Sequence, residues 1–421
     1  MNRYGDKCKR WKVVYACHFS PSLDVNKLQS QFSLLMKTVI VDSPALARTW
    51  LALPDALYKH DTNYIPHIRQ DIEGIFDPAK NRLFAGGQAR RWLICNKDGS
   101  PIGRVAAFFN PKYSDAQAQP TGGIGFFECV NDGAAAHLLL DTACQWLWEL
   151  GAEAIDGPIN FGEKEAYWGL LIENFADMGS FRMNYNLPYY RSLFENYGFQ
   201  IYYEQLCYKR DLHIPAQEVF VRKSQQLLQD GEFRVTNARG RSLEQIAGDF
   251  VTIYNAAWAV HEGFKPMKIE QARKAIQAMR PVMDRDIMVF AYHGDRPIGF
   301  YINLPEVNEF MRHAKGNLNA LGMLRFLIAK YFGKRNTMVG IVFGVDKAYH
   351  GRGVEGAMIK YCEEHIVTLN RYHETILTWI GDFNPKMIHI AENLGATLYR
   401  KLATYRIYRD LSRAVERHRK L

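Results

Sequence analysis

The chain contains a long internal repeat. The segment at 98–109, D-G-S-P-I-G-R-V-A-A-F-F, resembles the segment at 294–304, G-D-R-P-I-G-F-Y-I-N-L. Likewise, L-P-Y-Y-R-S-L-F-E-N-Y-G-F at 187–199 resembles N-P-K-M-I-H-I-A-E-N-L-G-A at 384–396. The two pairs are offset by 196 and 197 residues. Solenoid repeats are only about 20–50 residues long, so this period predicts two similar domains.

The length and composition agree with two globular domains. A chain of 421 residues is long enough for two separate cores. Hydrophobic residues make up 48% and charged residues 23%, as in ordinary soluble proteins. No stretch approaches about 18 uncharged apolar residues, so the sequence predicts no membrane span.

The cysteines and the net charge limit which classes of function this chain can have. The seven cysteines are scattered and none forms C-x-x-C, so we expect neither a disulfide framework nor a metal site, and we expect a cytoplasmic protein. The net charge of +9 fits nucleic acid, an anionic membrane surface or an anionic cofactor. Because Lys and Arg are dispersed and no nucleic-acid motif is present, we expect no nucleic-acid partner and interpret most of this charge as promoting solubility.

The repeat and the patterning suggest a division of the chain. We expect residues 1–36 to be a poorly ordered tail, or Met36 to be the physiological start. A first domain is expected at 37–212, a linker at 213–231 and a second domain at 232–421.

Both copies predict the same order of elements. Each has a strand, a turn, a second strand, a third strand and then an amphipathic helix. The strands are predicted at 91–96, 102–109 and 125–129 in the first copy and at 287–292, 298–304 and 340–345 in the second. The helices follow at 139–150 and 354–366.

The second copy contains an insertion at 317–334. Here Leu321, Leu324, Ile328, Tyr331 and Phe332 share one helical face. We interpret this segment first as a helix packed into the core with solvated lysines. The alternative is a surface that meets a membrane or an acyl chain.

The segment at 345–359, V-D-K-A-Y-H-G-R-G-V-E-G-A-M-I, carries the sharpest signal for chemistry. A strand runs into a glycine-rich turn and then into a helix. Glycines let the backbone approach a ligand, and the free N–H groups at a helix start bind anions such as pyrophosphate. The candidate binding residues of this loop are Val345, His350, Gly351, Arg352, Gly353, Val354 and Gly356.

This segment resembles the acyl-CoA loop of the GNAT N-acyltransferases, Arg/Gln-x-x-Gly-x-Gly/Ala. His350 stands at the Arg/Gln position, Gly353 at the first glycine and Glu355 at the final small residue. The resemblance implies an α/β fold of two tandem GNAT-like domains, each a mixed central sheet flanked by helices. The tyrosine that often serves this family as general acid would fall at Ala391, or at Phe194 in the first copy, so another group must replace it.

Segments along almost the whole chain resemble a bacterial family of tandem GNAT-like proteins that includes ceramide synthases. They are L-P-D-A-L-Y-K-H-D-T-N-Y-I-P, I-G-F-F-E, D-G-P-I-N-F, G-L-L-I-E-N-F, M-N-Y-N-L-P-Y-Y and Y-N-A-A-W-A-V-H-E-G-F-K-P. The resemblance implies transfer of an acyl group from acyl-CoA, or from an acyl-carrier protein, to a sphingoid base. The acyl thioester is a co-substrate, and no permanently bound cofactor is expected. A fatty substrate also implies contact with a membrane as a peripheral protein.

The first copy lacks the glycine loop, and we expect it to help form the acceptor pocket. Acylation needs a neutral amine and therefore a base. The catalytic candidates are Glu128 as base, with Tyr190 and Tyr185. The substrate-binding candidates are Asn160, Glu173, Asn186 and Tyr189. For each group a structural role is an alternative: an ion pair at a strand end for Glu128, and packing for the tyrosines.

Two rival functions stay open. One is a GNAT N-acetyltransferase or aminoacyltransferase that acts on a small amine or a peptide. The other is a non-catalytic acyl-CoA-binding module, because the usual acid tyrosine is missing. We expect the oxyanion donor to be a backbone N–H near Val345, where a strand splays open in GNAT folds.

Overall fold

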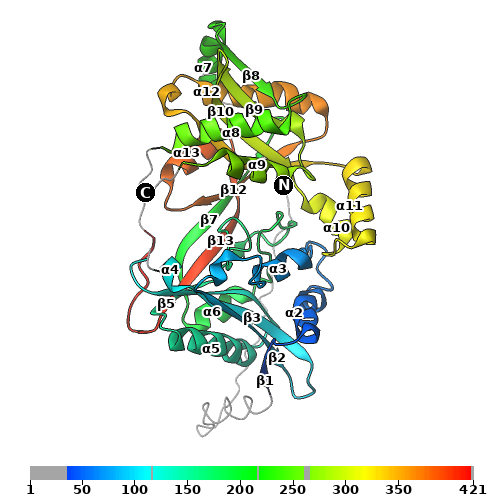
Figure 1. Cartoon of the computed structure of the whole chain (residues 1–421), viewed down its shortest axis with the longest axis vertical. Helices are drawn as coiled ribbons and strands as arrows, with labels where there is room; N and C mark the ends of the chain where they lie inside the picture. The colour runs from blue at the N-terminus through cyan, green and yellow to red at the C-terminus, as the bar shows by residue number, and fades with distance from the viewer. Residues whose placement is uncertain (1–35, 115–116, 216–217, 260–265, 419–421) are drawn as a thin grey trace, which may run out of the picture.

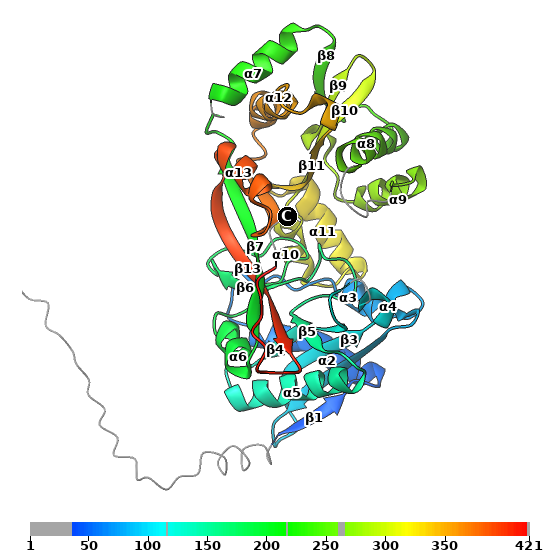
Figure 2. The ribbon, with the colours of Figure 1, turned by 90° about the vertical axis from the view of Figure 1, so that its left-hand side faces the viewer.

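The structure is a computed structural model that describes residues 36–114, 117–215, 218–259 and 266–418 (Figures 1 and 2). The predicted N-terminal tail, apart from Met36, lies outside the described residues. We call residues 37–212 the first half and the chain from residue 232 the second half.

The first half has the predicted order of elements. Its strands are β1 (Lys37–Ile40), β2 (Gln88–Cys95), β3 (Pro101–Phe109), β4 (Thr121–Cys129), β5 (Ala154–Gly157), β6 (Leu170–Glu173) and β7 (Gln200–Asp211). Its helices are α2 (Pro44–Leu57), α3 (Arg69–Ile75), the short η1 (Arg82–Phe84), α4 (Pro111–Ser114), α5 (Gly133–Glu149) and α6 (Tyr190–Tyr197).

The second half repeats this order, with an insertion. Its strands are β8 (Phe233–Asn237), β9 (Met288–His293), β10 (Arg296–Pro305), β11 (Thr337–Val345), β12 (Glu374–Gly381) and β13 (Thr397–Tyr408). Its helices are α8 (Leu243–Trp258), α9 (Ile269–Met279), α10 (Asn308–Ala314), α11 (Ala320–Phe332), α12 (Val354–Tyr361) and α13 (Pro385–Asn393). Short helical turns are η2 (Arg285–Ile287), η3 (Lys347–Tyr349), the π-helical η4 (Cys362–Ile366) and η5 (Val367–Leu369).

The matching segments of the repeat take the same structure. The two P-I-G turns start the second strand of the hairpins β2–β3 and β9–β10. The other pair forms α6 and α13, and each helix is followed by a glycine with positive φ, 114° at Gly198 and 76° at Gly395. Glycine adopts this left-handed conformation at low cost, which explains why both copies have it at the helix end.

Within the part of the chain that the structure describes, the strands form one mixed sheet of 13 strands. Its order is β1-β2-β3-β4-β5-β13-β7-β12-β11-β10-β9-β8, and β6 pairs with β13. Helices such as α5 and α12 pack on it and bury the cores of the two halves. The predicted α/β class is thereby confirmed.

The two halves exchange their last strands. β7 follows α6 of the first half but pairs with β12 of the second. β13 follows α13 of the second half but pairs with β5 of the first. β7 and β13 also pair with each other, and they lie side by side between the halves (Figures 1 and 2). The predicted domain limits stay a proposal, but each half is completed by a strand from the other.

The predicted linker 213–231 contains a helix, α7 (Glu218–Gln229). It packs beside α12, and Leu227 belongs to the core of the second half. This segment is therefore part of the fold of the second half.

The insertion forms the predicted helix, but our first interpretation of it is wrong. Leu321, Leu324 and Ile328 are exposed, as are Tyr331 and Phe332. The apolar periodicity identified a face without identifying what covers it. The buried positions of α11 lie on another stripe that packs against α10: Gly322, Phe326 and Ala329. Within the described residues, no helix is both long and apolar enough to cross a membrane.

A buried carboxyl lies where the halves meet. Glu306 Oε1 accepts hydrogen bonds from the N–H groups of Phe181 and Asn308, each at 2.9 Å. Burial raises the pKa of Glu306 from 4.5 to about 7. The folded protein therefore holds a proton that the unfolded chain releases above its lower pKa, and stability falls as pH rises through this window.

We accordingly expect Glu306→Gln to be more stable than the wild type at high pH. The amide oxygen of the glutamine can still accept the hydrogen bonds from Phe181 and Asn308. The two proteins should therefore have similar free energies of unfolding near pH 4.5. Above pH 7 the variant should gain up to about 3 kcal/mol. Urea unfolding at both pH values measures this difference. An equal gain at both would show that the proton on Glu306 is not responsible.

Candidate active site

The candidate site for the acyl donor begins where the two central strands β11 and β12 separate. The parallel strands β11 and β12 pair only from Thr337 with Glu374 to Gly340 with Leu377. Beyond Gly340, residues 341–345 of β11 have no strand partner on that side within the described part of the chain. Their backbone groups on this edge remain available to a ligand, except the Val345 carbonyl, which accepts a hydrogen bond from His350.

Both strands carry an extra residue at the point of separation. In β11, Ile341 is skipped between the pairs Ile302–Val342 and Asn303–Gly340. In β12, the register against β7 shifts after Leu377. Such bulges bend a strand and increase its twist, which explains why these strands part here. The opening begins at Gly340, earlier in the strand than the position near Val345 predicted from the sequence.

The predicted glycine loop lies at the far end of the same strand. Gly351 and Gly353 have φ of 76° and 96°, so both use a conformation that other residues rarely adopt. Gly353 is the N-cap of α12. A Cβ on Gly353 would lie 2.7 Å from the carbonyl oxygen of Lys223 in α7, so the loop packs against this helix.

The side chains of the loop have separate roles. His350 Nε2 lies 3.0 Å from the Val345 carbonyl oxygen, and because a carbonyl only accepts, this nitrogen donates. Arg352 is exposed and lies over the rings of Phe233 and Tyr349, at 5.2 and 5.5 Å. Val354 is buried in the core. The loop thus presents Arg352 and the backbone of Gly351 to the solvent, whereas Gly353 and Gly356 are buried.

Aromatic groups that the sequence analysis did not single out surround the opening. A Cβ on Gly340 would lie 3.4 Å from the Tyr301 hydroxyl, which places that hydroxyl at the point of separation. The Tyr301 ring packs against Phe343 at 5.4 Å. Trp258 covers Gly344 from α8. Trp258 ends Y-N-A-A-W, which belongs to one of the segments that resemble the tandem GNAT-like family, so this resemblance could have indicated it.

The equivalent opening in the first half is filled by the chain itself. β4 and β5 pair only as far as Gly123 with Asp156. The N–H of Ile159 then donates to the Ile124 carbonyl at 2.7 Å, and a Cβ on Gly125 would lie 1.9 Å from the Ile159 carbonyl oxygen. A ligand cannot occupy this space without displacing the backbone, which supports a donor site in the second half only.

Two of the three predicted catalytic residues, Glu128 and Tyr190, meet in a buried cluster. Glu128 Oε2 accepts hydrogen bonds from Tyr190 at 2.8 Å and from Tyr58 at 2.7 Å. Arg104 lies 3.6 Å from Glu128 Oε1, and its guanidinium packs over Trp50. Tyr58 and Arg104 were not predicted from the sequence, although Tyr58 belongs to the segment L-P-D-A-L-Y-K-H-D.

Burial dominates the acid–base properties of this cluster. It raises the pKa of Glu128, although Arg104 and the tyrosine hydroxyls oppose the shift. Burial and the Glu128 charge raise the pKa of both Tyr58 and Tyr190. The tyrosines therefore remain protonated hydrogen-bond donors to the carboxyl.

Three other predicted residues border this cluster. The Tyr189 hydroxyl donates to the Cys129 carbonyl at 2.6 Å. The Tyr185 hydroxyl donates to Asp61 at 2.7 Å. Asn186 forms two hydrogen bonds with the backbone of Leu171, which anchors β6.

The remaining two predicted residues lie apart. Asn160 is buried in the segment that fills the first opening, next to Gly162. Glu173 is exposed at the end of β6 and forms an ion pair with Lys401 at 2.8 Å. The structure does not bring these two side chains together with Glu128.

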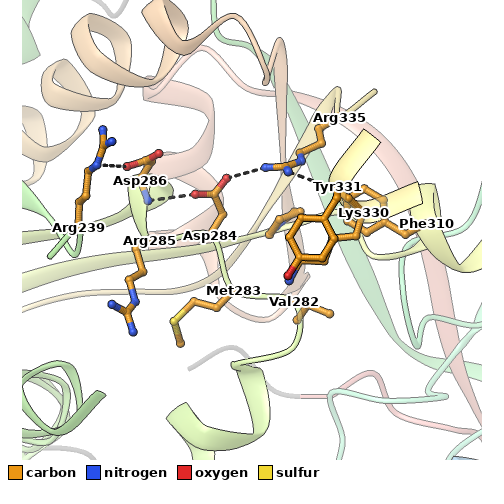
Figure 3. Close-up of a pocket in the computed structure, with 11 residues that line it drawn as sticks. Arg239, Val282, Met283, Asp284, Arg285, Asp286, Phe310, Lys330, Tyr331 and Arg335 are labelled. Carbon is orange, nitrogen blue, oxygen red and sulfur yellow. Dashed lines mark hydrogen bonds and ion pairs between the residues drawn. The ribbon is translucent and has the colours of Figure 1, made fainter. Parts of the chain in front are cut away.

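A cavity of about 390 Å³ lies at the other end of β11 (Figure 3). Its wall includes Pro305, which pairs with Met338 at the start of β11, so the cavity is remote from the opening. Asp284 in its wall accepts from Tyr372 and contacts Arg335 at 3.2 Å. The cavity is therefore not part of the candidate donor site.

The positions of the family's usual acid tyrosine are both buried. Ala391 packs in α13 against β7 and β12, and Phe194 packs in the first core. Neither side chain can transfer a proton. Tyr301 is the tyrosine whose hydroxyl the structure places beside the second-half opening.

Two named relatives match the chain over most of its length. A bacterial ceramide synthase of Caulobacter vibrioides is 26% identical over 385 residues, which cover 89% of this chain and 97% of the relative. Protein YghO of Escherichia coli K12 is 24% identical over 395 residues, with the same coverage. No protein-family model matches the chain.

Two solved structures align with most of this chain. One is a GCN5-related glucosamine N-acetyltransferase region in a fungal multi-domain β-N-acetylglucosaminidase, with a TM-score of 0.50 and 12% identity over 88% of this chain and 38% of that longer chain. Another is a tandem GNAT protein from the clavulanic acid pathway, with a TM-score of 0.49 and 10% identity over 89% of this chain and 98% of that one. The chain is thus similar in sequence to a bacterial ceramide synthase and shares the fold of a GCN5-related N-acetyltransferase region, as the sequence motifs predicted.

Proposed function

We propose that this protein transfers an acyl group from acyl-CoA or an acyl-carrier protein to the amine of a sphingoid base or a related lipid amine. We further propose that it works in the cytoplasm, at a membrane surface. The similarity to a bacterial ceramide synthase along 89% of the chain supports this choice of acceptor. A transferase for small amines would share the fold but would need no apolar surface.

The opening between β11 and β12 is the observation on which the donor site rests. It joins an unpaired strand edge at 341–345 to a glycine loop at the end of the same strand. A pyrophosphate at the N-terminus of α12 would meet free N–H groups and Arg352. The thioester arm would then follow the strand edge, with its carbonyl close to backbone N–H donors.

The reaction requires two proton transfers. The attacking amine must lose a proton, and the departing thiolate gains one. Tyr301 is our candidate for the group that gives a proton to the thiolate. Its hydroxyl lies where β11 and β12 separate, and burial raises its pKa, so it is protonated. Glu128 remains the predicted base, but its described contacts all lie in the first half. It can serve only if the acceptor amine reaches that side.

The proposed reaction is tested directly with purified protein, a long-chain acyl-CoA and sphinganine. Mass spectrometry should detect the amide, and one free CoA thiol should appear for each amide. Parallel reactions replace the donor by acyl-carrier protein and the acceptor by small amines. Product with small amines alone would move the acceptor to that class. No amide from any combination would overturn the transferase function.

Two variants separate the proposed proton-transfer roles. Tyr301→Phe keeps the packing against Phe343 and removes one hydroxyl, and it should lower kcat by about a hundredfold. Glu128→Gln keeps an acceptor for Tyr58 and Tyr190, and it should lower kcat similarly if Glu128 is the base. Both should leave the Kd for acyl-CoA unchanged.

The readouts also separate catalysis from structure. Glu128→Gln leaves Arg104 buried without an anionic partner, so its unfolding free energy must be measured beside kcat. A folded Glu128→Gln with normal turnover would remove this residue as the base. Normal turnover of Tyr301→Phe would show that another group gives the proton to the thiolate.

A further inference from the structure

Helix α11 carries an apolar surface that the rest of the described chain does not cover. The described residues include 13 exposed large hydrophobic side chains, and seven of them lie on this one helix. The α11 apolar face consists of Leu321, Met323, Leu324, Leu327, Ile328, Tyr331 and Phe332. The other six are dispersed over separate elements. Contiguous exposed apolar surface on a protein marks a site of interaction.

The composition of α11 differs from that of an ordinary surface helix. A surface helix has one apolar stripe toward the core and polar residues opposite. In α11 the stripe of Gly322, Phe326 and Ala329 already packs against α10, yet the opposite side is apolar too. Phe332 is 87% exposed and Tyr331 is 65% exposed. A helix that is apolar all round is normally buried, so this side lacks its partner.

The charges on α11 and just after α10 are positive, although Tyr331 also lines the cavity whose wall contains Asp284 and Asp286. From residue 310 to residue 345 the sequence has no Asp or Glu. Arg312, Lys315, Arg325 and Lys334 are exposed, and none of them forms an ion pair with any residue that the structure describes. Figure 1 shows α10 and α11 projecting at the side of the molecule. The face is therefore accessible to a large flat partner.

We infer that α11 docks onto an anionic lipid surface. The helix lies in the plane of the interface, with its apolar side chains among the acyl chains and its cations at the lipid phosphates. Charge complementarity favours this partner over a second copy of the chain. Two copies joined through α11 would bring the cations Arg325 and Lys334 of both copies into one interface, whereas anionic headgroups neutralise them. Docking would give the enzyme access to a lipid amine. In this respect the inference rests on the proposed function.

The experiment is flotation of the full-length protein with lipid vesicles. Vesicles of phosphatidylcholine with phosphatidylglycerol should bind it, vesicles of phosphatidylcholine alone should bind it weakly, and added salt should reduce binding. Leu324→Asp with Ile328→Asp should lower the partition coefficient at least about tenfold, since two apolar contacts become charges. Arg325→Glu with Lys334→Glu should reduce binding to the anionic vesicles in particular. Leu411→Asp, at a side chain 75% exposed elsewhere, is the matched control and should bind like the wild type.

The outcomes are distinct. Equal binding of the wild type and the double aspartate variant would overturn the inference, as would failure of the wild type to bind anionic vesicles. Light scattering that shows a dimer dissociated by Ile328→Asp, without vesicle binding, would assign the face to a second copy. Amide synthesis with detergent-dispersed sphinganine is measured in parallel and needs no vesicle. Amide without vesicle binding would reject the docking alone, and vesicle binding without amide would reject the proposed function alone.

Discussion

Gly353→Val is expected to lower the affinity for acyl-CoA at least about a hundredfold, which corresponds to about 2.7 kcal/mol. Gly353 has a φ of 96°, which a β-branched residue avoids. Its added Cβ would also lie 2.7 Å from the Lys223 carbonyl oxygen. Either effect moves the loop, so that the N–H groups at the start of α12 no longer point at one anion. Isothermal titration with a non-hydrolysable acyl-CoA analogue measures the loss.

The matched control for this variant is Gly99→Val. Gly99 also has a positive φ, 78°, but a Cβ there meets nothing within 4 Å. This control carries the backbone strain in the turn between β2 and β3, remote from the loop. It should lose some stability and keep its affinity for acyl-CoA. A folded Gly353→Val that binds acyl-CoA like the wild type would refute the assignment of the loop.

Arg406→Ala is expected to lower the free energy of unfolding by about 3–5 kcal/mol. Arg406 in β13 contacts Asp156 in β5 with two hydrogen bonds, of 2.6 and 2.8 Å, and both side chains are buried. Its removal leaves a buried carboxylate without a partner. The pair joins the exchanged strand to the first half. The whole unfolding transition should therefore shift to a lower urea concentration. Urea unfolding followed by tryptophan fluorescence measures this change.

Arg417→Ala provides the comparison for Arg406→Ala. Arg417 also forms ion pairs, with Asp382 at 2.7 Å and Glu204 at 3.6 Å, but its side chain is 48% exposed. Exposed ion pairs contribute about 0–1 kcal/mol. A similar small loss in both variants would mean that the Arg406–Asp156 pair does not hold the exchanged strand in place.

Local patterns in the sequence were sufficient for most of the elements. The P-I-G turns and the flanking apolar runs predicted the hairpins, because turn residues and alternation act over a few positions. The glycines at 351 and 353 predicted the loop because they are needed for its positive φ angles. The repeat then predicted a second copy of the same order.

Pairing over long distances could not be derived in this way. The strands β7 and β13 have the same apolar pattern whichever half they join, so the exchange leaves no local trace. Tyr58 reaches Glu128 across 70 positions, and no spacing rule connects them. Periodicity assigned Leu324 and Ile328 to one face of α11, but the exposure of that face depends on elements elsewhere in the chain.

The strand exchange has a consequence for how this protein is made. The core of the first half includes Tyr405 and Ile407, and Arg406 lies 250 positions after its partner Asp156. While a ribosome synthesises the chain, the first half must therefore wait for β13 before its core can close. Contacts of such separation slow folding and prolong the exposure of apolar strands. We therefore expect the first half to complete its fold only after β13 has been synthesised.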